Sequence, residues 1–538
     1  MATHMATVTE RPQAGPGLLP LAGCKESGRS ALARDTVVPR HTALALAAAM
    51  CVFGANAESV RVQMQLVSGA DVLQGHRAGS TSKSDSVISL VPSLSVRALG
   101  AQAQFLADVS LEGVAHLQGD SSTSLRPRGQ VSLKVSPIEN TLHLEASALA
   151  ERRGANAFDL RPDGLGAAND ATYLRTRLMP SFERALTPNL ALHLRSEHVW
   201  TRIVDVPGAP DPAQSGRATD QLLRLESRPL PLGWALELGH QAGRLSSASE
   251  DTIELTTARG VASYAAAEQL TLGASLGRER TRYSLVDRQD TLYGLRARWQ
   301  PSQRTEIRAS YEHRFFGAGI DFEARHRSPY LSLSLRLNRQ PVVQAGRYLV
   351  DPAGNGVTAI LDGILTTRVT DPAARAGAVQ SLVSGLGLPA ALSGAVDLTS
   401  QHAQLHEGAT ATAVLLGRRS LVSATVYMQR QRRLDQAVDL LLPTGTIGDT
   451  EQRGVELRVA HKLSATTAVD AGVRMNRVKG LGEDKGQWSN DNSVRVGLTY
   501  TLSPRSSLQF NLRRQLLDSN VVTPTNESAL TVRLSQRF

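Results

Sequence analysis

The residues most suited to chemistry in this sequence are arginines that recur in segments of alternating polarity. Successive side chains of a β-strand point to opposite faces, so these arginines share the face opposite the apolar residues. Aligned guanidinium groups attract anions and hold carboxylates or phosphates through paired hydrogen bonds. The candidate anion-contacting residues are Arg175, Arg177, Arg224, Arg296, Arg298, Arg308, Arg458 and Arg495. Alternatively, these arginines pair with Glu226, Glu312 and Glu456 and only solvate the face that they share.

The elements that must carry these arginines are strands of roughly ten residues. After residue 58 the chain repeats one unit, which is a strand, a short turn, a second strand and a longer polar connection. The short turns contain Pro, Gly, Asn or Ser, as tight turns require. Examples span residues 99–101, 186–189, 229–233, 301–303 and 503–505. Counting these units predicts about 22 strands, an even number as in bacterial outer-membrane barrels.

The predicted fold class is all-β: a transmembrane, antiparallel, up-and-down β-barrel over residues 58–538, with one partly helical insert. The mean hydropathy of -0.18 and 41% hydrophobic residues exclude a bundle of membrane-spanning helices. A soluble β-sandwich also alternates, but it needs crossover connections that repeated hairpins do not supply. Aromatic residues near predicted strand ends fit the interfaces of a membrane barrel, and these are Trp200, Trp234, Trp299 and Trp488.

The C-terminus continues the alternation to the last residue of the chain. Thr531, Arg533 and Ser535 share one face of this segment. We expect the opposite, apolar face to contact lipid and to be the signal for the barrel-assembly machinery, and it consists of Leu530, Val532, Leu534 and Phe538. Pairing this strand with the first strand would remove the open edge of the sheet.

The N-terminus has the pattern of a secretory signal. Arg40 and His41 precede an apolar stretch, residues 42–54, and Ala55-Asn56-Ala57 matches a cleavage site of small residues. Residues 1–57 are therefore predicted to be an N-terminal extension and signal peptide, followed by a chain bound for the bacterial outer membrane. The segment 21–24 resembles a lipoprotein box, but prolines and glycines interrupt the residues before it.

Other classes of function find little support in the sequence. Cys24 and Cys51 both precede residue 58, so neither a disulfide nor a cysteine metal site is expected in the barrel. A zinc-binding His-Glu-x-x-His helix and a phosphate-binding Gly-Lys loop are absent from the sequence. The net charge of +10 is spread among strands without the aromatic platform of single-strand binders. We predict no enzyme, no cofactor, no metal and no nucleic-acid partner.

One insert, residues 340–400, interrupts the hairpins and is far longer than an ordinary connection. Within it Asp371 is a suitable helix N-cap and Pro372 suits the first helical position. The predicted helix has one apolar face and ends before Gly387. The order of the strands places this insert at the long-loop end, where it covers the mouth, enters the lumen or packs as a surface cap. The candidate gate or plug residues are Asp371, Pro372, Arg375, Gly387 and Pro389.

Around this insert the sequence resembles the outer-membrane proteins associated with the PEP-CTERM/exosortase system of Gram-negative bacteria. The resemblance rests on Asp371-Pro372-Ala-Ala-Arg375, on Gly387-Leu-Pro-Ala-Ala-Leu392 and on Leu415-Leu-Gly417-Arg418. It extends to residues 84–111 and 173–192. The resemblance implies a β-barrel that exports or organises exopolysaccharide or sorted proteins at the cell surface, and it implies no individual functional residue.

Two classes of function remain. In the first, a porin-like transport barrel passes or exports an anionic polymer or solute through an arginine-rich lumen, with exopolysaccharide-export components as partners. In the second, a non-conducting structural barrel anchors surface polysaccharide or partner proteins. Either barrel contacts outer-membrane lipid, and basic residues near the outer rim are candidates for contact with lipopolysaccharide, namely Arg430, Arg432 and Arg433.

Overall fold

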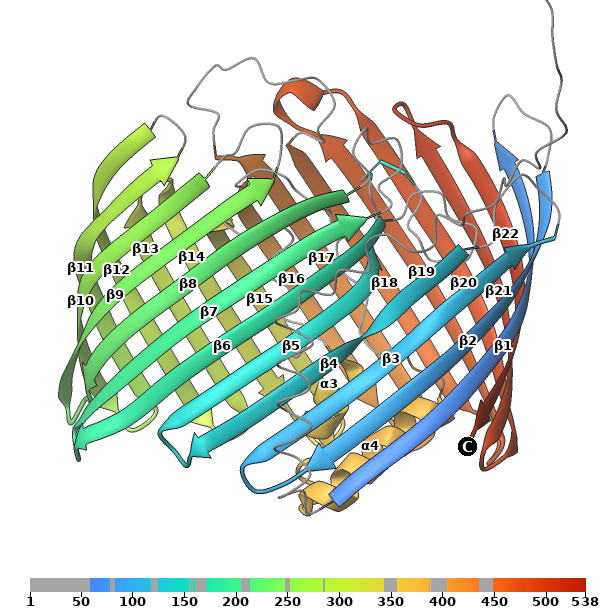
Figure 1. The fold of residues 1–538 in the computed structure, drawn as a ribbon, viewed down its shortest axis with the longest axis horizontal. Coiled ribbons are helices and arrows are strands. Elements are labelled where there is room, and N and C mark those ends of the chain that lie inside the picture. Colours follow the sequence, from blue (N-terminus) through green and yellow to red (C-terminus); the bar gives the residue numbers. More distant parts are fainter. Residues whose placement is uncertain are drawn as a thin grey trace, which may run out of the picture. The chain divides into compact units, whose positions relative to one another are not determined.

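The computed structural model describes residues 59–77, 83–117, 124–153, 156, 158–159, 171–204, 213–246, 252–283, 286–342, 356–386, 388, 404–434 and 449–538. The predictions for residues 1–57, Gly387 and Pro389 lie outside these residues. Within them, one sheet of 22 strands closes into a barrel (Figure 1). The prediction of an all-β antiparallel barrel is therefore confirmed. None of the helices in the described part of the chain is long and apolar enough to cross a membrane.

Each strand pairs antiparallel with the next along the chain. The strands are β1 (Ser59–Arg77), β2 (Lys83–Leu99), β3 (Ala103–His116), β4 (Ser124–Ile138), β5 (Leu142–Arg153), β6 (Ala171–Thr187), β7 (Leu190–Val204), β8 (Ala213–Ser227), β9 (Leu232–Ser246), β10 (Thr252–Ala267), β11 (Leu270–Tyr283), β12 (Val286–Ser302), β13 (Thr305–Arg314), β14 (Gly317–Arg327), β15 (Leu331–Val342), β16 (Gln404–Leu416), β17 (Ser420–Arg433), β18 (Thr450–Lys462), β19 (Thr467–Gly480), β20 (Trp488–Ser503), β21 (Ser506–Ser519) and β22 (Thr525–Arg537).

The last strand closes the barrel against the first. In the pairing of β22 with β1, Leu530 lies opposite Val72 and Leu534 lies opposite Ser68. The backbone N–H of Phe538 donates a hydrogen bond to the carbonyl of Met64 at 2.9 Å. The open edge of a strand leaves backbone N–H and C=O groups without hydrogen-bond partners. Closure supplies these partners, which a lipid environment cannot.

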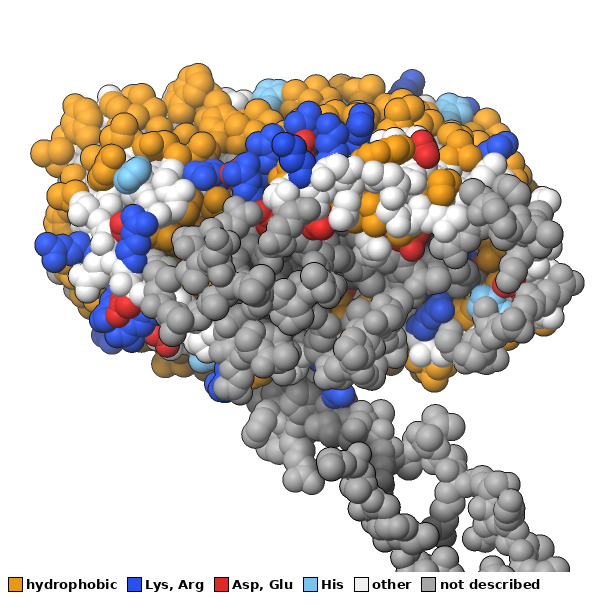
Figure 2. All heavy atoms as spheres, turned by 90° about the horizontal axis from the view of Figure 1, so that it is seen from above, with side chains coloured by type: hydrophobic (Ala, Val, Ile, Leu, Met, Phe, Trp, Pro, Cys, Tyr) orange, Lys and Arg blue, Asp and Glu red, His pale blue; other side chains and the backbone are white. Residues whose placement is uncertain are grey.

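Alternation along the strands separates an apolar outer wall from a polar inner wall. On β18, Val455 and Leu457 are exposed on the outer wall, whereas Arg458 is buried on the inner wall. Asp470 of β19 and Asp491 of β20 are likewise buried on the inner wall. Viewed from above, hydrophobic side chains form the upper edge of the picture, and a group of Lys and Arg side chains lies inside that edge (Figure 2). This arrangement is typical of barrels whose outer wall contacts lipid.

The two ends of the barrel differ in their connections. Every even-numbered strand up to β20 is followed by a tight turn, and the five short turns predicted from sequence all occur. Most odd-numbered strands are followed by longer connections, and only β11–β12 and β13–β14 are also short. The C-terminus lies at the short-turn end (Figure 1). We call the other end the long-loop end.

The insert between β15 and β16 contains two helices, α3 (Val357–Leu365) and α4 (Pro372–Gly385). Another short helix, η1 (Gly482–Asp484), lies between β19 and β20. Helix α4 begins as predicted, because the backbone N–H of Ala374 donates to Oδ2 of Asp371 at 2.8 Å. Helix α3 was not predicted, although its apolar residues Val357, Leu361 and Ile364 have helical spacing.

Both helices pack on the inner wall at the short-turn end (Figure 1). Their buried side chains form one cluster with an apolar patch of the inner wall, which consists of Val414, Leu416, Leu421 and Ala460. The guanidinium of Arg368 lies 4.0 Å from the ring centroid of Tyr330, beside the turn between β14 and β15. The insert leaves the wall at the long-loop end, as strand order predicts, but its helices lie at the opposite end. Their apolar faces require an apolar partner, and this patch supplies it.

Candidate lumenal anion site

A hollow of about 850 Å³ lies against the inner wall between β8 and β15. Eight arginines and four acids line it directly, and four further acids, Glu279, Glu306, Glu323 and Glu407, contact arginines of this lining. The arginines are Arg224, Arg228, Arg259, Arg296, Arg298, Arg308, Arg314 and Arg339, and the four lining acids are Glu226, Glu237, Glu312 and Asp321. Arg339 lies on the outward face of β15, opposite Ile320 and Glu407. Guanidinium groups that stay exposed among these ion pairs can bind an anionic solute.

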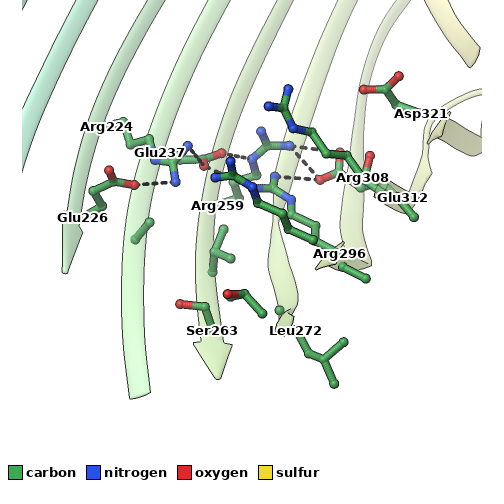
Figure 3. Close-up of a pocket in the computed structure, with 18 of the residues that line it drawn as sticks. Arg224, Glu226, Glu237, Arg259, Ser263, Leu272, Arg296, Arg308, Glu312 and Asp321 are labelled. Carbon is green, nitrogen blue, oxygen red and sulfur yellow. Dashed lines mark hydrogen bonds and ion pairs between the residues drawn. The ribbon is translucent and has the colours of Figure 1, made fainter. Parts of the chain in front are cut away.

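A ladder of ion pairs crosses this wall (Figure 3). Glu237 is only 4% exposed and lies within ion-pair distance of Arg224, Arg259 and Arg296. The guanidinium of Arg259 donates to both carboxylate oxygens of Glu312 at 2.8 and 2.9 Å. Arg296 donates to the same carboxylate at 2.9 Å. Because β8, β9, β10, β12 and β13 bring these residues to one height on the inner face, Glu237 and Glu312 hold three arginines, and Glu226 also contacts Arg224.

Three arginines of the hollow are exposed, namely Arg228, Arg298 and Arg308. The side chains of Arg298 and Arg308 are 60% and 53% exposed, and each contacts Glu306, at 3.0 and 2.8 Å. Arg259 and Arg296, by contrast, are only about a quarter exposed. Arg298 and Arg308 face each other on β12 and β13, close to the short turn that joins these strands. They are the side chains of the hollow best placed to contact an anion.

The structure places all eight predicted arginines on the inner wall, in three separate groups. Arg175 and Arg177 lie beside Glu197, with the Nε of Arg177 2.9 Å from its carboxylate. Arg458 and Arg495 share Asp470, each at 3.1 Å. The remaining four, Arg224, Arg296, Arg298 and Arg308, line the hollow. Contact with an anion stays a prediction for all eight.

The alternative, in which the arginines pair with inner-wall acids, describes much of this geometry. Glu226 contacts Arg224, and Glu312 contacts Arg296, as that alternative expects. Glu456 faces inward opposite Arg474. The strongest acceptor, Glu237, was missed from the sequence. Its position could have been predicted from the alternation of this strand. Trp234, Leu236 and Leu238 point outward, so Ala235 and Glu237 between them point inward.

The insert residues named from the sequence hold the two helices together. The guanidinium of Arg375 in α4 donates to Oδ1 of Asp362 in α3 at 2.7 Å, and also to the carbonyl of Val369 at 3.1 Å. Asp371 caps α4, as described above, and Pro372 is its first residue. The helix pair is thus one packed unit seated on the inner wall.

The residues predicted near the outer rim lie where strand order expects them. Arg430 is on the outer wall of β17 and contacts Glu407 and Glu451. Arg432 follows on the same face, and the side chain of Arg433, the last residue of β17, lies outside the described residues. Leu530, Val532, Leu534 and Phe538 share the outer face of the closing strand, with Phe538 67% exposed.

One sequence motif of serine hydrolases lies on the inner wall but lacks the geometry that the motif requires. The sequence contains one Gly-x-Ser-x-Gly, from Gly273 to Gly277, but it lies within the continuous strand β11. A nucleophile elbow requires a sharp strand-to-helix turn that exposes the serine, whereas Ser275 is 6% exposed. Among the residues that the structure describes, His, Cys, Asp and Glu form no group of three that could hold a metal ion.

No family model and no curated protein matches this sequence. Among solved structures, the barrel is similar to the FrpB iron transporter from Neisseria meningitidis, with a TM-score of 0.48 and 10% identity over 91% of this chain and 84% of that chain. It is also similar to Pseudomonas aeruginosa OccK2 (OpdF) in complex with glucuronate, with a TM-score of 0.34 and 12% identity over 89% of this chain and 98% of that chain. Pseudomonas aeruginosa OpdK with vanillate has a TM-score of 0.34 and 11% identity over 89% and 99% of the two chains.

Proposed function

We propose that this protein is an integral outer-membrane barrel that passes anionic solutes or polymers through its lumen. The observation that carries the proposal is the hollow between β8 and β15, whose facing arginines Arg298 and Arg308 are more than half exposed although each contacts Glu306. Exposed positive charge concentrates anions and repels cations inside a narrow, water-filled passage. Guanidinium groups also bind carboxylates and phosphates in a bidentate manner, so the solutes favoured are carboxylated or phosphorylated.

The position of the exposed arginines favours export over uptake. Arg298 and Arg308 lie near the short turn between β12 and β13, and short turns face the periplasm in outer-membrane barrels. An anion that enters from the periplasm therefore meets these two arginines early in its passage. We accordingly propose an acidic polysaccharide, made inside the cell, as the cargo of a PEP-CTERM-associated exopolysaccharide system.

Helices α3 and α4 are proposed to gate this passage. They pack on the inner wall at the short-turn end and so reduce the cross-section at the proposed entrance. Their contact with the wall is mainly apolar, through side chains such as Leu361 and Ile364, which are fully buried. Helices held by one apolar patch can leave the wall as a unit, without disturbing the hydrogen bonds between strands.

The decisive experiment measures conductance and ion selectivity of the refolded barrel in planar bilayers under a salt gradient. Three forms are compared: the wild type, a variant with residues 343–403 replaced by a short Gly-Ser linker, and Arg298→Gln/Arg308→Gln. The deletion should produce larger, anion-selective steps, and the double substitution should shift the reversal potential towards that of a neutral pore. Cation selectivity of the deletion variant would contradict the proposal.

A second candidate function is a non-conducting barrel that anchors surface polysaccharide or partner proteins. It is favoured by the packing of α3 and α4 inside the lumen and by the ion pairs that engage most inner-wall arginines. If this second function is correct, no form of the protein should conduct ions in the same experiment, and this includes the deletion variant. Correct folding is checked by the difference in electrophoretic migration between heated and unheated samples.

The link to exopolysaccharide is tested in the source organism. Deletion of the chromosomal gene should lower the acidic polymer in the medium and raise it in the periplasm, because synthesis continues while export stops. A gene copy with Arg298→Gln/Arg308→Gln should restore export only in part, and the wild-type gene should restore it fully. Normal polymer export in the deletion strain would refute this cargo.

A further inference from the structure

A second basic cluster lies on the outer wall, away from the lumen. Arg430, Arg453 and Arg477 occupy outward positions near the long-loop ends of β17, β18 and β19, and we call them the outer arginine patch. Arg453 is 58% exposed and shares its face with the exposed Val455. Arg477 likewise shares its face with the exposed Met475. These arginines therefore face the surroundings of the barrel.

The charges of this patch are crowded. Arg453 and Arg477 lie directly opposite each other in the pairing of β18 with β19. Like charges at opposed positions destabilise a sheet. Glu451 and Glu407 offset part of this charge, because Glu451 lies 2.6 Å from Arg453 and both carboxylates contact Arg430. An additional anion bound between Arg453 and Arg477 would offset the remainder.

An apolar groove of about 620 Å³ runs along the outer wall beside this patch. Arg453, Arg477, Asn490, Asn492 and Asp518 provide its polar edge, with Asp518 beyond Asn490 on the side away from Arg453. The groove forms because the small side chains of Ala409 and Ala411 on β16 lie between larger side chains on the neighbouring strands. The apolar residues of the groove on the outer wall are Leu335, Ala409, Ala411, Val426, Met428, Val455 and Met475.

From this juxtaposition we infer that the outer wall of β16–β20 is a binding site for a phosphorylated, acylated glycolipid of the lipopolysaccharide type. The arginines and asparagines bind the phosphate and sugar groups, and the groove holds an acyl chain. The inference goes beyond transport. It rests on the proposed outer-membrane location, because the long-loop end must face the leaflet that contains this lipid.

The chemistry favours this lipid over an ordinary phospholipid. Two opposed arginines with neighbouring amide groups suit a head group with more than one anionic and hydroxyl group, since each guanidinium can hold a phosphate through two hydrogen bonds. Lipid A combines phosphates, sugar hydroxyls and several acyl chains in one molecule. A glycerophospholipid also supplies a phosphate for the charge that Glu407 and Glu451 leave, but it lacks the sugar groups that Asn490 and Asn492 can bind.

The test is a titration of the folded, full-length barrel in detergent with fluorescently labelled lipid A. We expect Arg453→Gln/Arg477→Gln to weaken the apparent affinity at least tenfold, as loss of charge-assisted hydrogen bonds should. The matched control is Arg280→Gln/Arg282→Gln, which removes two outward arginines of β11 that contact Asp287. This control should change the affinity less than twofold.

A third variant tests the groove separately from the charge. Ala411→Leu fills the groove while keeping an apolar residue on the outer wall, and it should also weaken binding. Equal weakening by both double variants, or equal competition by phosphatidylglycerol, would overturn the inference. None of these substitutions changes the lumen, so the reversal potential should equal that of the wild type. A silent barrel that still binds lipid A would refute transport and leave this site standing.

Discussion

Leu361→Ala should release the helix pair from the inner wall and open the lumen. Leu361 is fully buried in the cluster that joins α3 to Val414, Leu416 and Leu421. Truncating a buried leucine to alanine costs about 3 kcal/mol. Since about 1.4 kcal/mol corresponds to a factor of ten, the ratio of undocked to docked helices rises by roughly 150-fold. A resting undocked fraction of about one in a thousand then becomes about one-tenth.

Because alanine has the highest helix propensity, the substitution weakens docking without weakening the helix itself. Single-channel recordings measure the fraction of time spent in the large conductance state found for the 343–403 deletion. The matched control is Thr358→Ala, a substitution at an exposed position of the same helix. A Leu361→Ala barrel that is correctly folded and no more open than this control would refute the gate, provided that the deletion variant conducts.

Three further predictions follow from single contacts. Glu312→Gln releases the two guanidinium groups that its carboxylate binds and should increase anion selectivity in the reversal potential, whereas Glu254→Gln, on the outer wall, should not. Asp371→Ala removes the N-cap of α4, which is typically worth about 1 kcal/mol, and should raise the open fraction less than Leu361→Ala does. Deletion of Phe538 removes its hydrogen bond to Met64 and should lower the temperature at which the barrel unfolds. The readout is the temperature above which the protein migrates on the gel like the heat-denatured form.

Local patterns in the sequence were sufficient for the wall of the barrel. Alternating polarity fixes which side chains face out, and Pro, Gly, Asn and Ser mark the turns, so faces, turns and the even strand number could all be predicted. The same alternation also predicts that Arg298 and Arg308 face inward. These features depend only on residues close together in the chain.

The partners of the arginines could not be predicted in the same way. Glu237 and Arg296 are far apart in sequence and meet because β9, β10, β11 and β12 align in a particular register. A shift of register by two residues would keep every side chain on its face and change every partner. The position of α3 and α4 could not be predicted either. The order of the strands shows at which end the insert leaves the wall, but it does not show where the apolar faces of the helices become buried.

Ion pairing on the inner wall and attraction of anions are compatible because a paired guanidinium group can still be exposed to the lumen. Glu237 contacts three arginines, and Glu312 and Glu306 contact two each. The arginines are shared as well, because Arg224 also contacts Glu226 and Arg308 also contacts Glu323. The acids therefore fix the positions of the arginines, while Arg298 and Arg308 stay more than half exposed. We expect these exposed guanidinium groups, and not a count of arginines and acids, to determine the sign of the selectivity.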